Sequence, residues 1–165
     1  LQMRRTYGLA SYLNIIEQLR KRDPLFNFTT DIMTGFPGET GEDFNITCDI
    51  IKQVGFSHVH TFKYSVRQGT RAERMPDQIP EKVKQQRSQL IRKLSLENKE
   101  KYRREFIGKQ QTVLVEKITK SGLAKGYGEY YVPVEYKPSK PGNNYFETVT
   151  IKHIASASHD FILKD

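Results

Sequence analysis

The sequence predicts an α/β unit followed by a small β unit, with the boundary near Gly108. Residues 1–107 alternate between helical and extended periodicity. Residues 108–165 hold short β-rich segments separated by Gly, Asn, Pro and Ser, and contain none of the arginines. A chain of 165 residues suffices for one ordinary domain, or for part of one with a small second unit. We therefore expect two units, residues 1–107 and 108–165.

The α/β unit begins with a predicted helix over residues 9–22. Its apolar residues recur at helical spacing, its last turn is basic, and Asp23-Pro24 ends it. Residues 26–33, "FNFTTDIM", are rich in aromatic and β-branched residues, which is typical of a strand.

A second helix and strand follow at once. Thr40 and Asp43 have the spacing of a capping box, and Gly55 fits the C-terminal stop of the helix between them. Residues 58–64, "HVHTFKY", then predict a second strand. Strand, helix and strand with short links indicate a βαβ unit and a parallel pair. Two parallel strands cannot bury both faces of a sheet, so we expect a fragment of a larger sheet or barrel, or an edge that pairs with a second copy.

The unit ends with a loop and a long helix. Residues 65–80 predict the loop, and residues 80–106 lack proline and glycine after Pro80, which fits the first turn of a helix. The residues expected near one face of this helix are Val83, Leu90, Leu94, Tyr102 and Phe106.

Four or five short strands predict a small antiparallel barrel in the second unit. The β-rich segments are residues 110–118, 126–136, 145–154 and 159–165.

Charge and composition limit the function classes. The net charge of +8 and the isoelectric point near 9.5 favour a polyanionic partner such as nucleic acid, or an anionic membrane surface. The alternative is a charge that only aids solubility. No apolar run approaches the roughly 20 residues of a membrane span, and no secretory signal is evident, so we expect no membrane association and a cytoplasmic location. One cysteine, Cys48, excludes an internal disulfide and is expected to be a buried small hydrophobe.

The turn from Gly35 to Thr40 lies where α/β proteins bind ligands, after a strand and before a helix. It lacks the Gly-Lys-Ser/Thr of a P-loop and the three glycines of a dinucleotide fingerprint. Phe36 and Pro37 would also obstruct a pyrophosphate cradle. A tight structural turn and a cofactor site at the strand ends both remain open.

The loop after the second strand is rich in arginine. Arg67, Arg71 and Arg74 lie close together in the sequence, and arginine forks suit phosphate groups. The alternative is that they pair with local acids. His58 and His60 share a strand face and could hold a metal ion, but no third ligand is evident.

Tyrosines and lysines are interleaved in the β unit. Tyr127, Tyr130 and Tyr131 lie among Lys117, Lys120 and Lys125, a combination that often grips unpaired RNA. The alternative is that some of these tyrosines face the core, as strand alternation requires.

Taken together, these motifs resemble the radical S-adenosylmethionine methylthiotransferases. The resemblance is carried by "TTDIMTGFPGETGEDF" at residues 29–44, by "GFSHVHTFKYSVRQGTRAERMPDQIPEKVKQQR" at 55–87, and by the Gly108-Lys109 that opens the β unit. It implies that residues 1–107 are the last part of a radical-enzyme, partial TIM-like barrel, including the long helix 80–106. Residues 108–165 would be an RNA-binding TRAM domain.

The resemblance also implies a reaction, which is insertion of sulfur and a methyl group at carbon 2 of an adenosine in tRNA. The branch most similar to residues 58–80 acts on N6-threonylcarbamoyladenosine beside the anticodon, so the anticodon stem-loop would be the partner. Sister branches modify isopentenyladenosine in tRNA, or an aspartate of a ribosomal protein. The cofactors would be S-adenosylmethionine and two [4Fe-4S] clusters. The cluster cysteines are absent from this chain, so we expect it to be inactive alone.

The resemblance assigns two groups of residues. Those implied at the cofactor are Asp31, Met33, Gly35, Phe36, Pro37, Gly38, Glu39, Phe62, Tyr64 and Ser65. Those implied at RNA are Arg67, Arg71, Arg74, Lys109, Lys117, Lys125, Tyr127 and Tyr130. The alternatives are a non-catalytic RNA-binding module and a stand-alone α/β nucleotide-binding protein. Self-association through an exposed barrel edge is also open.

Overall fold

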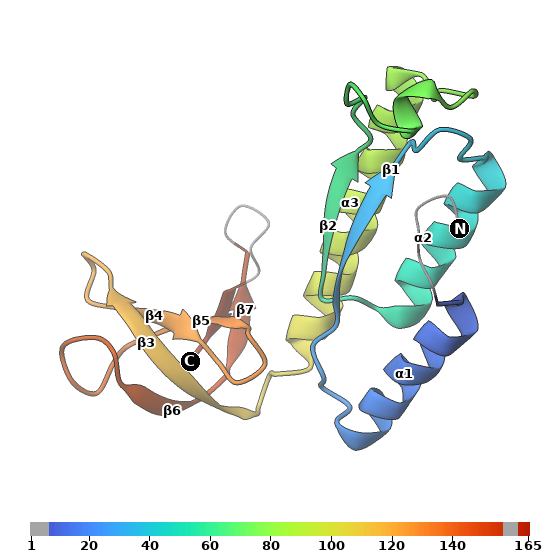
Figure 1. The fold of residues 1–165 in the computed structure, drawn as a ribbon. Helices are drawn as coiled ribbons and strands as arrows, with labels where there is room; N and C mark the ends of the chain where they lie inside the picture. The colour runs from blue at the N-terminus through green and yellow to red at the C-terminus, as the bar shows by residue number, and fades with distance from the viewer. Residues whose placement is uncertain (1–6, 157–161) are drawn as a thin grey trace.

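The computed structural model describes residues 7–156 and 162–165, which form two sheets on either side of Gly108 (Figure 1). The first part of the chain contains α1 (Leu9–Arg22), β1 (Thr29–Thr34), α2 (Gly41–Val54), β2 (His58–Lys63), the short 3-10 helix η1 (Ala72–Arg74) and α3 (Glu81–Arg104). The predicted α-β-α-β order and the long third helix are confirmed. Whether residues 1–107 and 108–165 are independent domains stays a prediction.

The predicted capping box starts α2. The Thr40 Oγ accepts the Asp43 N–H at 3.0 Å, and the Asp43 carboxylate accepts the Thr40 N–H at 2.9 Å. Two of the backbone donors that a helix start leaves free are thereby satisfied. Gly55 ends the helix with φ at 63°, a left-handed conformation that glycine adopts at low cost.

β1 and β2 form a parallel pair whose register runs from Thr29 opposite His58 to Thr34 opposite Lys63. The side of this pair that faces the helices is buried in a cluster with residues of α1, α2 and α3. The cluster consists of Ile16, Phe44, Cys48, Ile51, Val54, Phe56, Val59, Ile91 and Leu94. Cys48 is thus a buried side chain, as expected.

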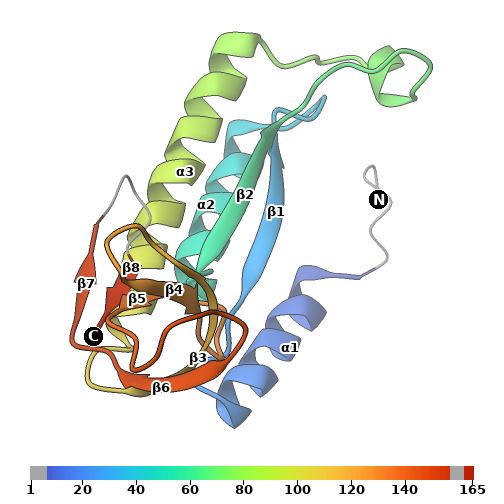
Figure 2. The same cartoon turned by 90° about the vertical axis from the view of Figure 1, so that its left-hand side faces the viewer.

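The opposite side of the pair is not covered by a helix (Figure 2). We call it the open face; it carries Asp31 and Met33 of β1 beside His60 and Phe62 of β2. Met33 is 41% exposed and Phe62 is 53% exposed. An uncovered face with two exposed apolar side chains on a two-stranded parallel sheet agrees with the expectation that further strands belong there.

α3 buries a more polar face than the hydrophobic pattern predicts. Leu90 is 43% exposed, whereas Ser95 and Asn98 are buried. The Ser95 Oγ accepts the Val59 N–H at 2.9 Å, and the Asn98 amide donates to the Ile51 carbonyl at 2.9 Å. A pattern based on apolar residues misses this face because its polar side chains bond to backbone groups of neighbouring elements.

The second part of the chain forms a six-stranded sheet with the order β6-β3-β4-β5-β8-β7. Its strands are β3 (Gln110–Ile118), β4 (Ala124–Tyr127), β5 (Pro133–Tyr136), β6 (Phe146–Thr150), β7 (His153–Ala155) and β8 (Ile162–Lys164). The predicted β-rich segment at residues 126–136 is divided between the end of β4, a hairpin turn and β5.

The second sheet differs from the predicted small antiparallel barrel in two respects. β5 and β8 are parallel, and the edge strands β6 and β7 do not pair with each other within the described residues. The two edges are nevertheless consecutive in the chain, joined through Ile151 and Lys152. The backbone of Ile151 forms hydrogen bonds with Gly108 and Lys109, just before β3, and the Lys152 N–H donates to the Lys164 carbonyl in β8. One bent segment therefore lies along both edges of the curled sheet.

Phe106 anchors the second sheet to the end of α3. It is fully buried, but it packs with the sheet residues rather than with the face of α3 to which its spacing assigned it. Its ring contacts those of Tyr102 and Tyr130 at centroid distances of 5.2 and 5.4 Å. The Tyr102 hydroxyl also donates to the Leu25 carbonyl at 2.8 Å, which holds the end of α3 to the segment between α1 and β1.

Within the described residues, no helix is both long and apolar enough to cross a membrane.

Candidate functional site

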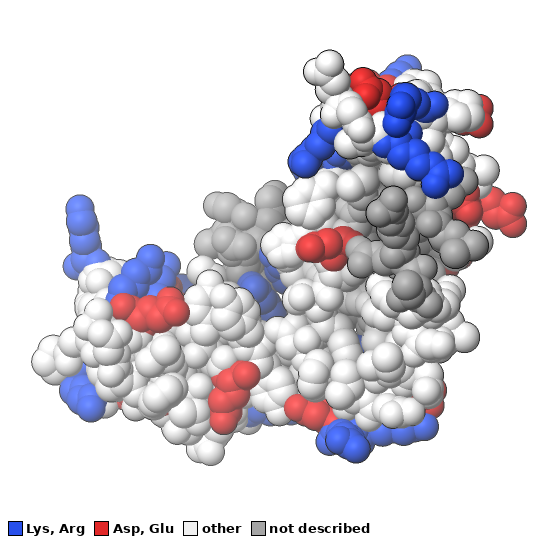
Figure 3. Space-filling view, in the orientation of Figure 1, with Lys and Arg blue, Asp and Glu red and all other residues white. Residues whose placement is uncertain are grey.

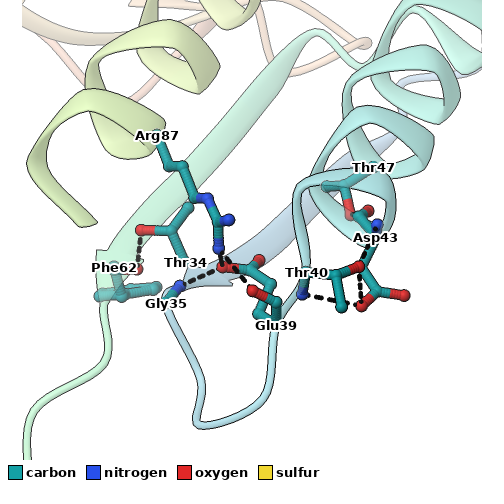
Figure 4. Close-up of polar contacts among 8 residues, drawn as sticks. All are labelled: Thr34, Gly35, Glu39, Thr40, Asp43, Thr47, Phe62 and Arg87. Carbon is teal, nitrogen blue, oxygen red and sulfur yellow. Dashed lines mark hydrogen bonds and ion pairs between the residues drawn. The ribbon is translucent and has the colours of Figure 1, made fainter. Parts of the chain in front are cut away.

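The turn that follows β1 is stabilised by an ion pair between Glu39 of the turn and Arg87 of α3 (Figure 4). The Glu39 carboxylate accepts the Gly35 N–H at 2.6 Å and the Arg87 guanidinium at 2.5 Å. Arg87 also donates to the Glu39 carbonyl at 3.0 Å. Both side chains are mostly buried, at 14% and 12% exposure. The Glu39 carboxylate therefore braces the turn against α3, and its predicted contact with a cofactor stays a prediction.

Gly35 is required by close packing as well as by its backbone. Its φ is 75°, and a Cβ at this position would lie 2.3 Å from the Cγ of Lys84. Pro37 is also fully buried, whereas Gly38 is exposed and donates its N–H to the Asp77 carbonyl at 3.0 Å. The turn is thus a tightly packed structure at the carboxyl end of β1.

An aromatic contact joins this turn to the end of β2. The ring of Phe36 meets the ring of Tyr64 edge-on at 5.5 Å, and the Lys84 ammonium lies 5.3 Å from the centre of the Tyr64 ring. The Tyr64 hydroxyl is buried and has no hydrogen-bond partner within the described residues. A buried hydroxyl without a partner is unusual, because burial removes its bonds to water.

The remaining predicted cofactor residues lie on or next to the open face. Asp31 lies opposite His60, and Met33 lies opposite Phe62. Ser65 is exposed one residue after Tyr64, whose N–H donates to the Thr34 carbonyl at 2.8 Å. Two parallel strands end at this edge, so the structure brings the predicted cofactor residues of both strands together.

The arginine loop lies at the same end of the strands, where the cations gather at the top of the space-filling view (Figure 3). Arg67, Arg71 and Arg74 are exposed and make no ion pair within residues 7–156 and 162–165. The nearby Glu73 carboxylate instead accepts the Gly69 N–H at 2.7 Å. Pairing with local acids therefore does not account for these arginines.

The predicted RNA-binding lysines differ in their surroundings. Lys109 and Lys117 are exposed. Lys125 pairs with Glu135 at 2.8 Å, and Glu135 also pairs with Lys164 at 2.7 Å. Hydrogen bonds from these two lysines hold the pKa of Glu135 below its usual range. The charge of Lys125 is thus already compensated within the sheet.

The tyrosines of the β4–β5 hairpin divide between the core and the surface. Tyr130 packs on Phe106, its carbonyl accepts the Asn27 amide at 2.5 Å, and burial raises the pKa of its hydroxyl. Tyr127 is exposed and stacks on Tyr131, with ring centroids 4.7 Å apart and an interplanar angle of 16°. The contacts of Tyr130 thus indicate packing between the two parts of the chain. Tyr131 is exposed, although it is not among the predicted RNA-binding residues.

A groove of 700 Å³ lies between β2, α3 and the second sheet. Charged and aromatic side chains from both parts of the chain line it, including Lys99, Arg103, Lys117, Lys125, Tyr127 and Tyr131. This composition suits a polyanion that also presents flat apolar surfaces.

Comparisons with known proteins identify the family. The chain is 38% identical over 154 residues, 93% of its length, to the threonylcarbamoyladenosine tRNA methylthiotransferase MtaB of Thermotoga maritima. It is 36% identical over 135 residues to the protein of the same name from Chlamydia pneumoniae, and 42% identical over 119 residues to a tRNA-2-methylthio-N(6)-dimethylallyladenosine synthase of Caldicellulosiruptor saccharolyticus. The chain belongs to the tRNA methylthiotransferase family. It spans 35%, 32% and 25% of these relatives, which is about a third of their length or less. No family model matches the chain.

Of the cofactors that this family resemblance implies, S-adenosylmethionine fits the residues of this chain and an iron–sulfur cluster does not. For S-adenosylmethionine, the open face supplies apolar surface, and the unpartnered Tyr64 hydroxyl lies beside the turn. For an iron–sulfur cluster the residues do not fit, because the single cysteine, Cys48, is buried in α2. His58 and His60 touch each other edge-on at 4.3 Å, but no group of three potential metal ligands occurs in the described part of the chain.

Proposed function

We propose that this chain is the C-terminal part of a radical S-adenosylmethionine methylthiotransferase. Its substrate would be N6-threonylcarbamoyladenosine beside the tRNA anticodon, modified at carbon 2. The observation that carries the proposal is the placement of the Gly35–Thr40 turn and the exposed arginine loop at the same end of two parallel strands. The relative that aligns over 93% of the chain favours this adenosine over the isopentenyladenosine of the sister branch.

In this proposal the open face and its turn hold part of S-adenosylmethionine. The contributing residues are Asp31, Met33, Gly35, Phe36, Pro37, Gly38, Phe62, Tyr64 and Ser65, with Glu39 fixing the turn. S-adenosylmethionine supplies the radical when it is bound next to a reduced cluster. The residues of this chain orient it, and Met33 and Phe62 exclude water from one side. Because the cluster cysteines are not among these residues, the chain alone would be inactive.

The second half of the proposal concerns RNA. Arg67, Arg71 and Arg74 would contact phosphates at the substrate edge, and residues 108–165 would act as a TRAM domain. A non-catalytic RNA-binding protein is the second candidate, and the single cysteine is the observation that favours it. Further strands or a second copy of the chain would cover the open face.

The RNA half is tested by the salt dependence of tRNA binding. Arg71→Gln is expected to reduce the slope of log affinity against log salt by about 0.7–0.9, the contribution of one phosphate contact. Arg104→Gln is the matched control, because Arg104 is also exposed but pairs with Glu100 on the same helix. Filter binding of unmodified tRNA over a range of salt concentrations measures both slopes. Equal slopes for the wild type and Arg71→Gln would remove the arginine loop from the RNA contact.

The cofactor half is tested in a protein extended to the full length of its relatives. Phe62→Ala is expected to raise the KM for S-adenosylmethionine cleavage by about tenfold or more, because a buried aromatic contact contributes about 1.5–3 kcal/mol. Phe62 is half exposed here, so thermal unfolding should hardly change. Ile46→Ala on α2, 48% exposed, is the control and should leave KM unchanged. An unaltered KM in Phe62→Ala would reject the open face as the cofactor site.

A further inference from the structure

Four exposed side chains form a continuous row across the outer face of the second sheet. Leu114 of β3 lies directly opposite Phe146 of β6 and also opposite Tyr127 of β4. Tyr131 extends the row, because its ring stacks on Tyr127. Cross-strand partners point to the same side of a sheet, so these side chains share one surface. Phe146 is 71% exposed and Tyr131 is 74% exposed. We call Leu114, Tyr127, Tyr131 and Phe146 the aromatic row.

The backbone of Tyr131 shows that its exposure is not incidental. Its φ is 56°, a left-handed conformation that is an outlier for a bulky residue and is usually given to Gly or Asn in a hairpin. The Tyr131 N–H donates to the Gly128 carbonyl, and the Gly128 N–H donates to the Val132 carbonyl. A glycine would close the same turn with less strain. The Tyr131 side chain gains little burial within the chain, so packing does not explain its presence.

Positive charge lies next to the stacked pair. Tyr127 and Tyr131 border the groove, which Lys117 also lines. Lys117 is exposed and makes no ion pair within the described residues, and Glu116 is the one acid among the groove residues. Parallel aromatic faces beside cations match a single-stranded nucleic acid, whose bases stack and whose phosphates need counter-charges. The parallel aromatic faces therefore favour stacked bases over a protein ligand.

We propose that the aromatic row is a stacking platform for unpaired RNA bases, and that the phosphates of the same strand follow the groove past Lys117. The inference rests on the proposed tRNA function and deepens it. It identifies unpaired loop bases as the part of the RNA that the second sheet binds. It also adds Leu114, Tyr131 and Phe146 to the RNA-binding residues.

The test compares two RNA probes on the 165-residue chain, a hairpin with an unpaired loop and a blunt duplex of equal length. Tyr131→Gly is expected to weaken hairpin binding about tenfold or more, the effect of losing one base–aromatic stack, and to leave duplex binding unchanged. The same variant should unfold at a higher temperature than the wild type, because glycine relieves the left-handed strain. A loss of binding together with a gain of stability cannot result from misfolding.

Three further variants separate stacking from other effects. Tyr131→Phe keeps the ring and should bind the hairpin like the wild type. Asn144→Gly is the matched control, since Asn144 is also exposed with φ at 59° and carries no ring. It should not change hairpin affinity. Because the chain has no tryptophan, Tyr127→Trp introduces a single tryptophan, which can be excited selectively above the tyrosine absorption, and the hairpin loop should quench its emission.

The remaining outcomes each overturn the inference in a recognisable way. If the wild type binds the hairpin and Tyr131→Gly binds equally well, RNA contacts the chain elsewhere and only the platform is wrong. If neither probe binds, and Arg71→Gln also leaves the slope of log affinity for tRNA against log salt unchanged, the proposed function fails together with the platform. If Tyr131→Phe binds as weakly as Tyr131→Gly, the hydroxyl and not the stack makes the contact.

Discussion

Replacing Arg87 with alanine is expected to lower the free energy of unfolding by about 3–5 kcal/mol, the usual cost of leaving one partner of a buried pair alone. Its guanidinium is the cationic partner of the mostly buried Glu39 carboxylate and also bonds to the Glu39 carbonyl. Without it, the Glu39 carboxylate keeps only the Gly35 N–H as a partner among the residues that the structure describes. Urea denaturation followed by circular dichroism measures the loss.

A double variant shows whether the unpaired charge of Glu39 causes the loss of stability. Glu39→Gln removes the charge and retains an oxygen that can accept the Gly35 N–H. The variant with both changes should therefore be more stable than Arg87→Ala alone, with a coupling of at least about 1 kcal/mol. Arg92→Ala is the control on the same helix, because Arg92 is exposed, and it should change stability by less than about 0.5 kcal/mol. A similarly small effect of Arg87→Ala would show that the pair does not support the turn.

Local signals in the sequence predict most of the fold of the first part. Capping residues, Gly55 and the periodicity of residues 9–22 act within a few positions, and the structure agrees with them to within a residue or two. The buried face of α3 is different, because Ser95 and Asn98 bond to backbone groups 36 and 47 positions away. Such contacts depend on the tertiary arrangement and leave no periodic pattern.

The candidate site divides in the same way. The turn at Gly35 and the arginine loop are recognisable as motifs, and the structure brings both to one end of the strands. The role of Glu39 as a brace depends on Arg87, which lies 48 positions away. In the second part, the strand alternation assumed for residues 126–136 fails at the hairpin. The distribution of Tyr127, Tyr130 and Tyr131 between surface and core therefore follows from the turn and not from a period of two.

Replacing Phe106 with alanine is expected to lower stability by about 3–5 kcal/mol, because a fully buried ring leaves a cavity that its neighbours fill only in part. Ile107→Ala is the adjacent control, 44% exposed, and should cost far less.

The same variant tests whether the two parts of the chain fold independently. Phe106 packs in the cluster of the second sheet but follows directly on α3, where it contacts Tyr102. If residues 108–165 form a separate domain, Phe106→Ala should lower the unfolding temperature of that sheet, followed by the backbone amide NMR signals of β3 to β5. The unfolding temperature of α1 to α3, followed by their own amide signals, should stay unchanged. If the two parts unfold as one, both signals should shift together by the full amount. Neither signal shifting would contradict the burial of the ring. Because the aromatic row belongs to the sheet on which Phe106 packs, unfolding of that sheet alone should abolish hairpin RNA binding while the helices still unfold at the wild-type temperature.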